Sequence, residues 1–152
     1  MRLTKQTNYA VRILMYCAAN NEELSRVSEI ALAYNLSEAF LFKILKPITD
    51  NGFISSVRGR NGGIKLAMPA EEISLLDIVR VTEDNFAMAD CFDKGPTNCP
   101  LVDACTLNTV WSEALNAFFD VLEKHTISDL VKPSPNINLL LGLELPTELQ
   151  IS

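Results

Sequence analysis

Three of the four cysteines in this chain of 152 residues lie close together, at Cys91, Cys99 and Cys105. Their spacing is Cys-x7-Cys-x5-Cys, in a stretch without hydrophobic periodicity that Pro100 interrupts. Structural zinc sites favour Cys-x2–4-Cys pairs and four ligands, so three thiolates at this spacing fit an iron–sulfur cluster better. A zinc site, a plain thiol switch and three ordinary thiols remain alternatives.

The fourth cysteine, Cys17, lies on the apolar face of a predicted first helix and is expected to be a small core residue. No stretch approaches the ~18 apolar residues of a membrane span, and no secretion signal is evident. We therefore expect a cytoplasmic protein with reduced cysteines and no membrane partner. One histidine and no nucleophile–base pair argue against an enzyme acting on a small-molecule substrate.

The charge is divided unevenly along the chain. Residues 1–68 carry nine basic and five acidic residues, a net charge of +4, whereas residues 69–152 carry four basic and fourteen acidic residues, a net charge of −10. Phosphate binding requires local positive charge rather than a positive total. The division indicates that the first half binds nucleic acid and that the second half has a different role.

The first half has the order of elements of a winged helix-turn-helix. Apolar periodicity and turn residues predict helices at 4–20, at 27–34 and from Ser37 onward, then strands at 53–57 and 64–68. A turn of about three residues between the second and third helices is typical of a helix-turn-helix. Asn61-Gly62 predicts a hairpin turn in which both residues have positive φ, and a hairpin after a recognition helix is a wing.

The third helix and the wing supply the candidate DNA contacts. Lysines on the helix suit phosphate or guanine, and arginines on a glycine-rich wing can grip phosphate or enter a minor groove. Some winged helices bind proteins instead, so a non-DNA interaction module remains an alternative. The candidate DNA-binding residues are Ser37, Phe40, Lys43, Lys46, Arg58, Arg60 and Asn61.

The second half contains the longest predicted helix, from Leu107 to His125. Its apolar stripe is wider than a small winged helix needs, so we expect it to pair with a second copy and supply a two-fold axis for palindromic DNA. The dimerisation candidates are Leu107, Trp111, Leu115, Phe118 and Leu122. The expected organisation is a DNA-binding domain at 1–69, a connecting helix at 70–84, a cluster loop at 85–106, a dimerisation helix at 107–127 and a C-terminal tail at 128–152.

These segments resemble the bacterial iron–sulfur winged-helix transcription regulators over residues 1 to about 143. The resemblance is carried by the opening Met1-Arg2-Leu3-Thr4-Lys5, by the wing from Val57 to Gly63 and by the three-cysteine loop. Leu41-Phe42-Lys43-Ile44-Leu45 and Cys99-Pro100-Leu101-Val102-Asp103 look most like the rhizobial iron regulator of that family. The resemblance implies a homodimer that carries one [4Fe–4S] cluster per subunit, binds double-stranded operator DNA and represses iron-uptake genes when iron is plentiful.

The chain departs from its relatives at the fourth cluster ligand. Asn108 stands where one relative has a histidine, and Asn8 stands where another has an aspartate supplied by the partner subunit. A neutral amide binds iron feebly, so we expect no strong fourth protein ligand. Asp90, Asp93 and Asp103 lie near the cysteines and are weaker candidates.

Overall fold

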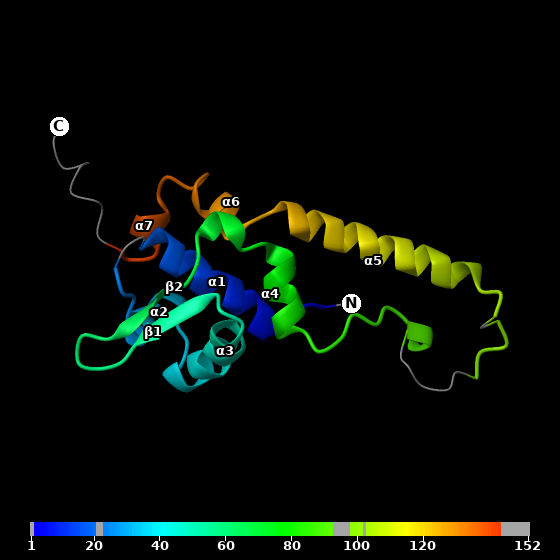
Figure 1. The fold of residues 1–152 in the computed structure, drawn as a ribbon, viewed down its shortest axis with the longest axis horizontal. Coiled ribbons are helices and arrows are strands. Elements are labelled where there is room, and N and C mark those ends of the chain that lie inside the picture. Colours follow the sequence, from blue (N-terminus) through cyan, green and yellow to red (C-terminus); the bar gives the residue numbers. More distant parts are fainter. Residues whose placement is uncertain (1, 21–22, 93–97, 102, 144–152) are drawn as a thin grey trace.

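The computed structural model describes residues 2–20, 23–92, 98–101 and 103–143. This part of the chain is mainly helical with one two-stranded antiparallel hairpin (Figure 1), which confirms the predicted fold class. The helices are α1 (Lys5–Ala19), α2 (Val27–Tyr34), α3 (Glu38–Asp50), α4 (Leu75–Thr82), α5 (Thr106–Lys124), α6 (Ile127–Val131) and α7 (Ile137–Leu140). The strands are β1 (Ile54–Val57) and β2 (Gly63–Leu66), and the short 3-10 turns are η1 (Ala70–Glu72) and η2 (Asp90–Phe92).

Local capping sets the helix-turn-helix. Asn35 ends α2 in the left-handed conformation at φ 52°, which asparagine adopts more readily than most residues. The Ser37 hydroxyl then accepts the Phe40 backbone N–H at 3.3 Å and begins α3. Pro47 does not end α3, which continues to Asp50. The turn between α2 and α3 therefore has the length that the sequence predicts.

The wing forms where the sequence places it, but its turn is different. Ile54 pairs with Leu66 and Val57 with Gly63, which leaves a five-residue loop from Arg58 to Gly62. In this longer loop the positive φ falls at Gly59 (114°), and Asn61 is not among the residues with positive φ. The hairpin is therefore confirmed, whereas the prediction of positive φ at Asn61 and Gly62 is wrong. Gly62 is required for space instead, since a Cβ there would lie 2.2 Å from the Val57 carbonyl oxygen.

A single apolar core joins the two halves of the chain. Ile13 of α1 and Leu41 of α3 are fully buried in the same cluster as Ile73, Ile78 of α4 and Ile127 of α6. The wing is attached to the segment just before α2 by mutual backbone hydrogen bonds of 2.8 Å between Ser25 and Ile64. The helix-turn-helix, α4 and α6 are thus packed as one body.

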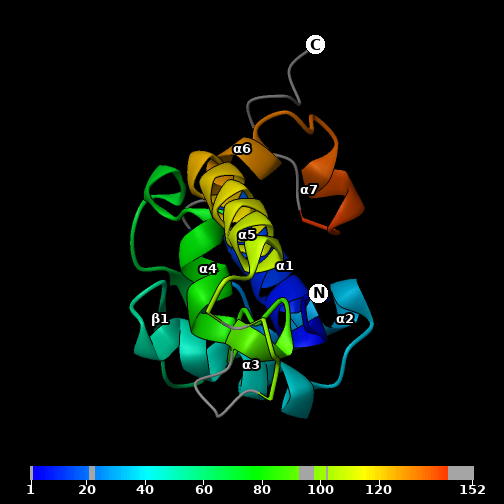
Figure 2. The ribbon, with the colours of Figure 1, turned by 90° about the vertical axis from the view of Figure 1, so that its right-hand side faces the viewer.

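Helix α5 projects from this body. In two perpendicular views, α3 and the hairpin lie on one side and α5 on the other (Figures 1 and 2). None of the 19 residues of α5 is buried within the chain. No helix among the described residues has the length and apolarity to cross a membrane.

A hydroxyl–carboxylate network fastens α1 to the end of α4, where the cysteine loop departs. One Glu83 carboxylate oxygen accepts the Thr4 N–H at 2.7 Å, the Thr4 hydroxyl at 3.0 Å and the Thr7 hydroxyl. The Thr7 hydroxyl also lies 2.8 Å from that of Thr82, and both threonines are buried. Glu83 therefore satisfies donors that would otherwise be left in a partly buried seam.

Replacing Glu83 by alanine should lower stability measurably. The change leaves the Thr7 hydroxyl without its charged acceptor, which costs about 1–3 kcal/mol. For a chain of this length the melting temperature should fall by about 2–4 °C per kcal/mol, as measured by circular dichroism. Glu23→Ala removes an exposed carboxylate and serves as the control. Equal melting temperatures for the two variants would contradict a stabilising role for Glu83.

Candidate nucleic-acid interface and cysteine loop

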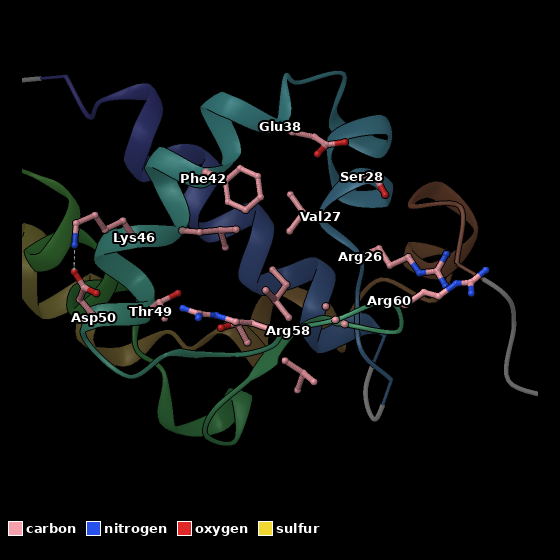
Figure 3. A pocket seen from close by; sticks show the side chains of 17 residues that line it. Arg26, Val27, Ser28, Glu38, Phe42, Lys46, Thr49, Asp50, Arg58 and Arg60 are labelled. Atoms are coloured by element: carbon pink, nitrogen blue, oxygen red, sulfur yellow. Dashed lines mark hydrogen bonds and ion pairs between the residues drawn. The ribbon is translucent and has the colours of Figure 1, made fainter.

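A groove of about 710 Å³ opens between α3 and the wing. Its walls come from the start of α2, the outer face of α3 and the hairpin, and Figure 3 shows side chains from all three facing it. The cations that line it are Arg26, Lys46, Arg58 and Arg60, against the two carboxylates Glu38 and Asp50. Arginine stays protonated at any physiological pH, so the groove carries a net positive charge in an otherwise acidic protein.

The predicted DNA-binding residues fall into three groups. Lys46, Arg58 and Arg60 line the groove, whereas exposed Lys43 of α3 and Asn61 of the wing loop lie outside it. The Lys46 ammonium contacts the Asp50 carboxylate at 2.7 Å. Hydrogen bonding and the charge of Asp50 raise the pKa of Lys46, so it remains a cation.

The remaining two candidates, Ser37 and Phe40, have structural partners. The Ser37 hydroxyl caps α3, as described above. The Phe40 ring is half-buried and meets the Tyr9 ring of α1 edge-on, with the ring centroids 5.8 Å apart. The Phe40 contact holds α3 against α1, and the Ser37 contact begins α3.

Several residues of the groove are absent from the predicted list of DNA contacts. Arg26 immediately precedes α2, and Phe42 lies on the exposed side of α3, one helical turn before Lys46. A signal for Phe42 existed, because it is an aromatic residue out of phase with the buried stripe of its helix. Arg26 gave no comparable signal, since the hairpin that faces it is distant in sequence.

The three clustered cysteines mark the beginning and end of an irregular segment. Cys91 lies in η2 and is exposed, Cys99 is exposed in the loop, and Cys105 is the half-buried N-cap residue of α5. The described parts of this segment, among them η2, lie toward the start of α5 and away from the wing (Figure 1). Within the described residues, no group of three or more His, Cys, Asp or Glu side chains is gathered in a geometry that holds a metal.

The donor set nevertheless suits an iron–sulfur cluster. Thiolates are the ligands such clusters use, and Cys105 stands at the N-terminus of α5 as its N-cap residue. Asn8 is exposed on α1 and Asn108 lies in the first turn of α5. Of the weaker candidates, Asp103 is exposed, Asp90 lies in η2 and Asp93 is outside the described residues. The residues present thus have the chemistry of a cluster site with three protein thiolates. The described residues of one chain are not gathered in the geometry of such a site.

Cys17 is a core residue, as predicted. Its side chain is 3% exposed in α1, and burial raises the pKa of its thiol to about 12, with a hydrogen bond to Ser25 acting in the opposite direction. A thiol that stays protonated is neither a nucleophile nor a metal ligand. Cys17 is therefore separated from the chemistry of the other three.

The predicted dimerisation stripe is only partly covered. Trp111, Leu115, Phe118 and Leu122 are half-buried and Leu107 is 55% exposed. Phe119, beside the stripe, meets Phe86 edge-on within the chain, with the ring centroids 4.9 Å apart. Val110 and Val121 are 55% and 54% exposed on the same helix. A large part of the apolar surface of α5 is thus left uncovered by the described chain.

Comparison with known proteins identifies relatives along nearly the whole chain. The Rrf2 family model, described as an iron-dependent transcriptional regulator, matches residues 3–133. Protein aau3 of Rhizobium meliloti (strain 1021) is 64% identical over 152 residues, covering 100% of this chain and 99% of that protein. The HTH-type transcriptional regulator NsrR of Oceanobacillus iheyensis is 41% identical over 145 residues, covering 95% of this chain and 99% of that protein.

A solved structure matches the fold as well. The crystal structure of oxidized Staphylococcus aureus CymR superposes with a TM-score of 0.69 at 29% sequence identity, covering 86% of this chain and 96% of that one.

Proposed function

This chain belongs to the Rrf2 family of transcriptional regulators, and from that premise we propose that it is an iron-responsive repressor. As a homodimer in the cytoplasm, it binds palindromic operator DNA through residues 1–69 while each subunit carries an iron–sulfur cluster. Loss of the cluster releases the operator. The observation that carries the proposal is the cationic groove between α3 and the wing, in the same chain as three clustered cysteines of which two are exposed.

The DNA-binding part of the proposal rests on where positive charge is placed. A recognition helix enters the major groove with its N-terminal half, and the wing lies beside it, so Arg58 and Arg60 reach the adjacent backbone or minor groove. Lys43 is exposed on α3 and reaches a phosphate or base edge from there. Ser37 and Phe40 support this interface by holding α3 in place.

Alanine substitution of Arg58, Arg60 or Lys43 should each weaken operator binding by about tenfold or more without unfolding the protein. Removal of one phosphate-binding cation lowers the dependence of log K on log salt by about one, hence about two for a dimer. Fluorescence anisotropy with a labelled duplex over a salt series measures both. Lys124→Ala removes an exposed positive charge from α5 and is the matched control. Unchanged affinity in all three variants would contradict the winged-helix interface.

The sensing part of the proposal assigns the cluster to Cys91, Cys99 and Cys105. When bound, a [4Fe–4S] cluster supplies a group that iron scarcity and oxygen both destroy. Three thiolates leave one iron to a weak ligand such as water, a small thiol or a carboxylate. A weakly held iron would make the cluster labile, and Cys91 in η2 and Cys105 at the start of α5 would lose their common ligand when it is lost.

Installing a stronger fourth ligand should slow the loss of the cluster. Under anaerobic conditions an iron chelator is expected to bleach the wild-type protein and free the operator. Asn8→Asp or Asn108→His should slow bleaching several-fold if the open iron is the point of attack. Absorbance and DNA binding are followed together after chelator addition, with Asn116→Asp on the exposed side of α5 as control. Bleaching that leaves operator binding intact would refute the sensing mechanism.

A second candidate function is a regulator whose cysteines bind zinc or act as a thiol switch, or one that senses oxygen or nitric oxide rather than iron. The exposure of Cys91 and Cys99 favours the thiol switch, because exposed thiols are open to oxidation. Absorbance spectra and metal analysis separate the cluster from the zinc and thiol forms. An anaerobically purified [4Fe–4S] protein is brown and contains iron and sulfide, whereas zinc and thiol forms are colourless.

A further inference from the structure

The face of α3 that lines the groove presents three residues one helical turn apart, Glu38, Phe42 and Lys46. The middle one is apolar and 57% exposed. Four aliphatic residues of α3 are already buried in the core, so the fold does not need a phenyl ring at this position. They are Leu41, Ile44, Leu45 and Ile48, of which Leu45 also touches the groove.

The surroundings of Phe42 form a small apolar spot inside a cationic rim. Val27, at the start of α2, lies opposite the ring in the groove, and Figure 3 shows the two side chains pointing toward one another. Arg26 and Arg58 line the same groove, as does the single carboxylate Glu38 near the pair (Figure 3). An apolar surface framed by cations is complementary to a ligand that is polyanionic outside and carries an apolar group within.

Duplex DNA fits this description, because its backbone is polyanionic and one of its bases carries an apolar group on its edge. Among the base edges of the major groove, thymine alone displays an apolar group, its C5-methyl. We propose that Phe42 is a specificity-determining residue that packs against the C5-methyl group of one thymine in each operator half-site. This inference rests on the DNA binding proposed above and adds the base that α3 selects.

The size of the effect follows from the burial of one methyl group. Removing a methyl from such an interface weakens binding by about fourfold. Since a two-fold symmetric dimer makes the contact twice, removal in both half-sites multiplies to roughly fifteenfold.

Deoxyuridine substitution tests the contact without altering base pairing. The anaerobically purified protein first selects its operator from a pool of random duplexes, and each thymine of the selected sequence is then replaced by deoxyuridine, symmetrically in both half-sites. For the wild type we expect one thymine position per half-site whose methyl removal weakens binding by roughly fifteenfold. Phe42→Ala should bind the operator more weakly but lose its sensitivity at that position alone.

Leu32→Ala is the matched control, because Leu32 is an 84% exposed apolar residue of α2 outside the groove lining. It should keep the wild-type deoxyuridine profile. A wild-type profile without a sensitive thymine, or a Phe42→Ala profile identical to the wild type, overturns the assignment while DNA binding stands. Failure of the wild type to select or bind any duplex overturns the proposed function itself.

Discussion

Replacing Cys91, Cys99 or Cys105 by alanine is expected to abolish both the brown colour and specific operator binding. A cube with three protein thiolates cannot lose one and remain anchored, since two irons would then lack protein ligands. Without the cluster, only sequence-independent binding should remain, typically about a thousandfold weaker or more. Absorbance, iron and sulfide analysis after anaerobic purification, with anisotropy on a labelled operator, measures both losses.

Cys17→Ala is the control for this experiment. Cys17 is buried in α1 and its pKa is raised to about 12, so its removal should leave colour and operator binding intact. If a variant of Cys91, Cys99 or Cys105 stays brown and still binds the operator, the replaced cysteine is not a cluster ligand. Colourless wild-type protein that still requires all three cysteines for regulated DNA binding would favour the zinc or thiol-switch function.

The helix-turn-helix was predictable because local chemistry determines it. The apolar period of α1, the left-handed Asn35 and the Ser37 cap are each read from a few neighbouring residues. The conformation of the wing turn was not predictable, although its dipeptide Asn61-Gly62 is a strong turn signal. Pairing of Val57 with Gly63 sets a five-residue loop, and in that loop Gly59 takes the positive φ. Strand register therefore outweighs a local preference.

The composition of the groove depends on contacts between distant segments. Arg26 and Arg58 share it only because Ser25 pairs with Ile64, which no local pattern reveals. Phe40 is turned toward Tyr9 while Phe42 faces the groove, a difference that the helical period of α3 indicates. Lys46, Arg58 and Arg60 were found because charge on a helix and on a wing is itself the signal.

The arrangement of the cysteines could not be read from their spacing either. Metal binding is coupled to folding, because a preformed site rarely exists in the unfolded chain. Cys91 and Cys105 are held by η2 and the start of α5, whereas the residues between them follow no periodic pattern. The sequence therefore predicts the donors of the site and leaves their geometry to the bound state.

Phe118→Asp is expected to convert the homodimer to a monomer and to abolish tight operator binding. Phe118 lies in the half-buried stripe of α5, a helix with no residue buried within its own chain. In a two-fold interface the same patch meets itself, so the change places two unpaired carboxylates near the axis. That cost should weaken dimerisation by at least roughly a thousandfold, which sedimentation velocity over a concentration series measures.

Operator affinity should fall in parallel, because a monomer reads one half-site and loses the multiplied affinity of two. Asn116→Asp adds the same charge to the exposed side of α5 and should leave the protein dimeric and bound. The two variants carry equal net charge, so repulsion of DNA by the added carboxylate affects both and cannot account for a difference between them. A Phe118→Asp protein that sediments as a dimer would mean that the stripe of α5 is not the surface that joins the two subunits.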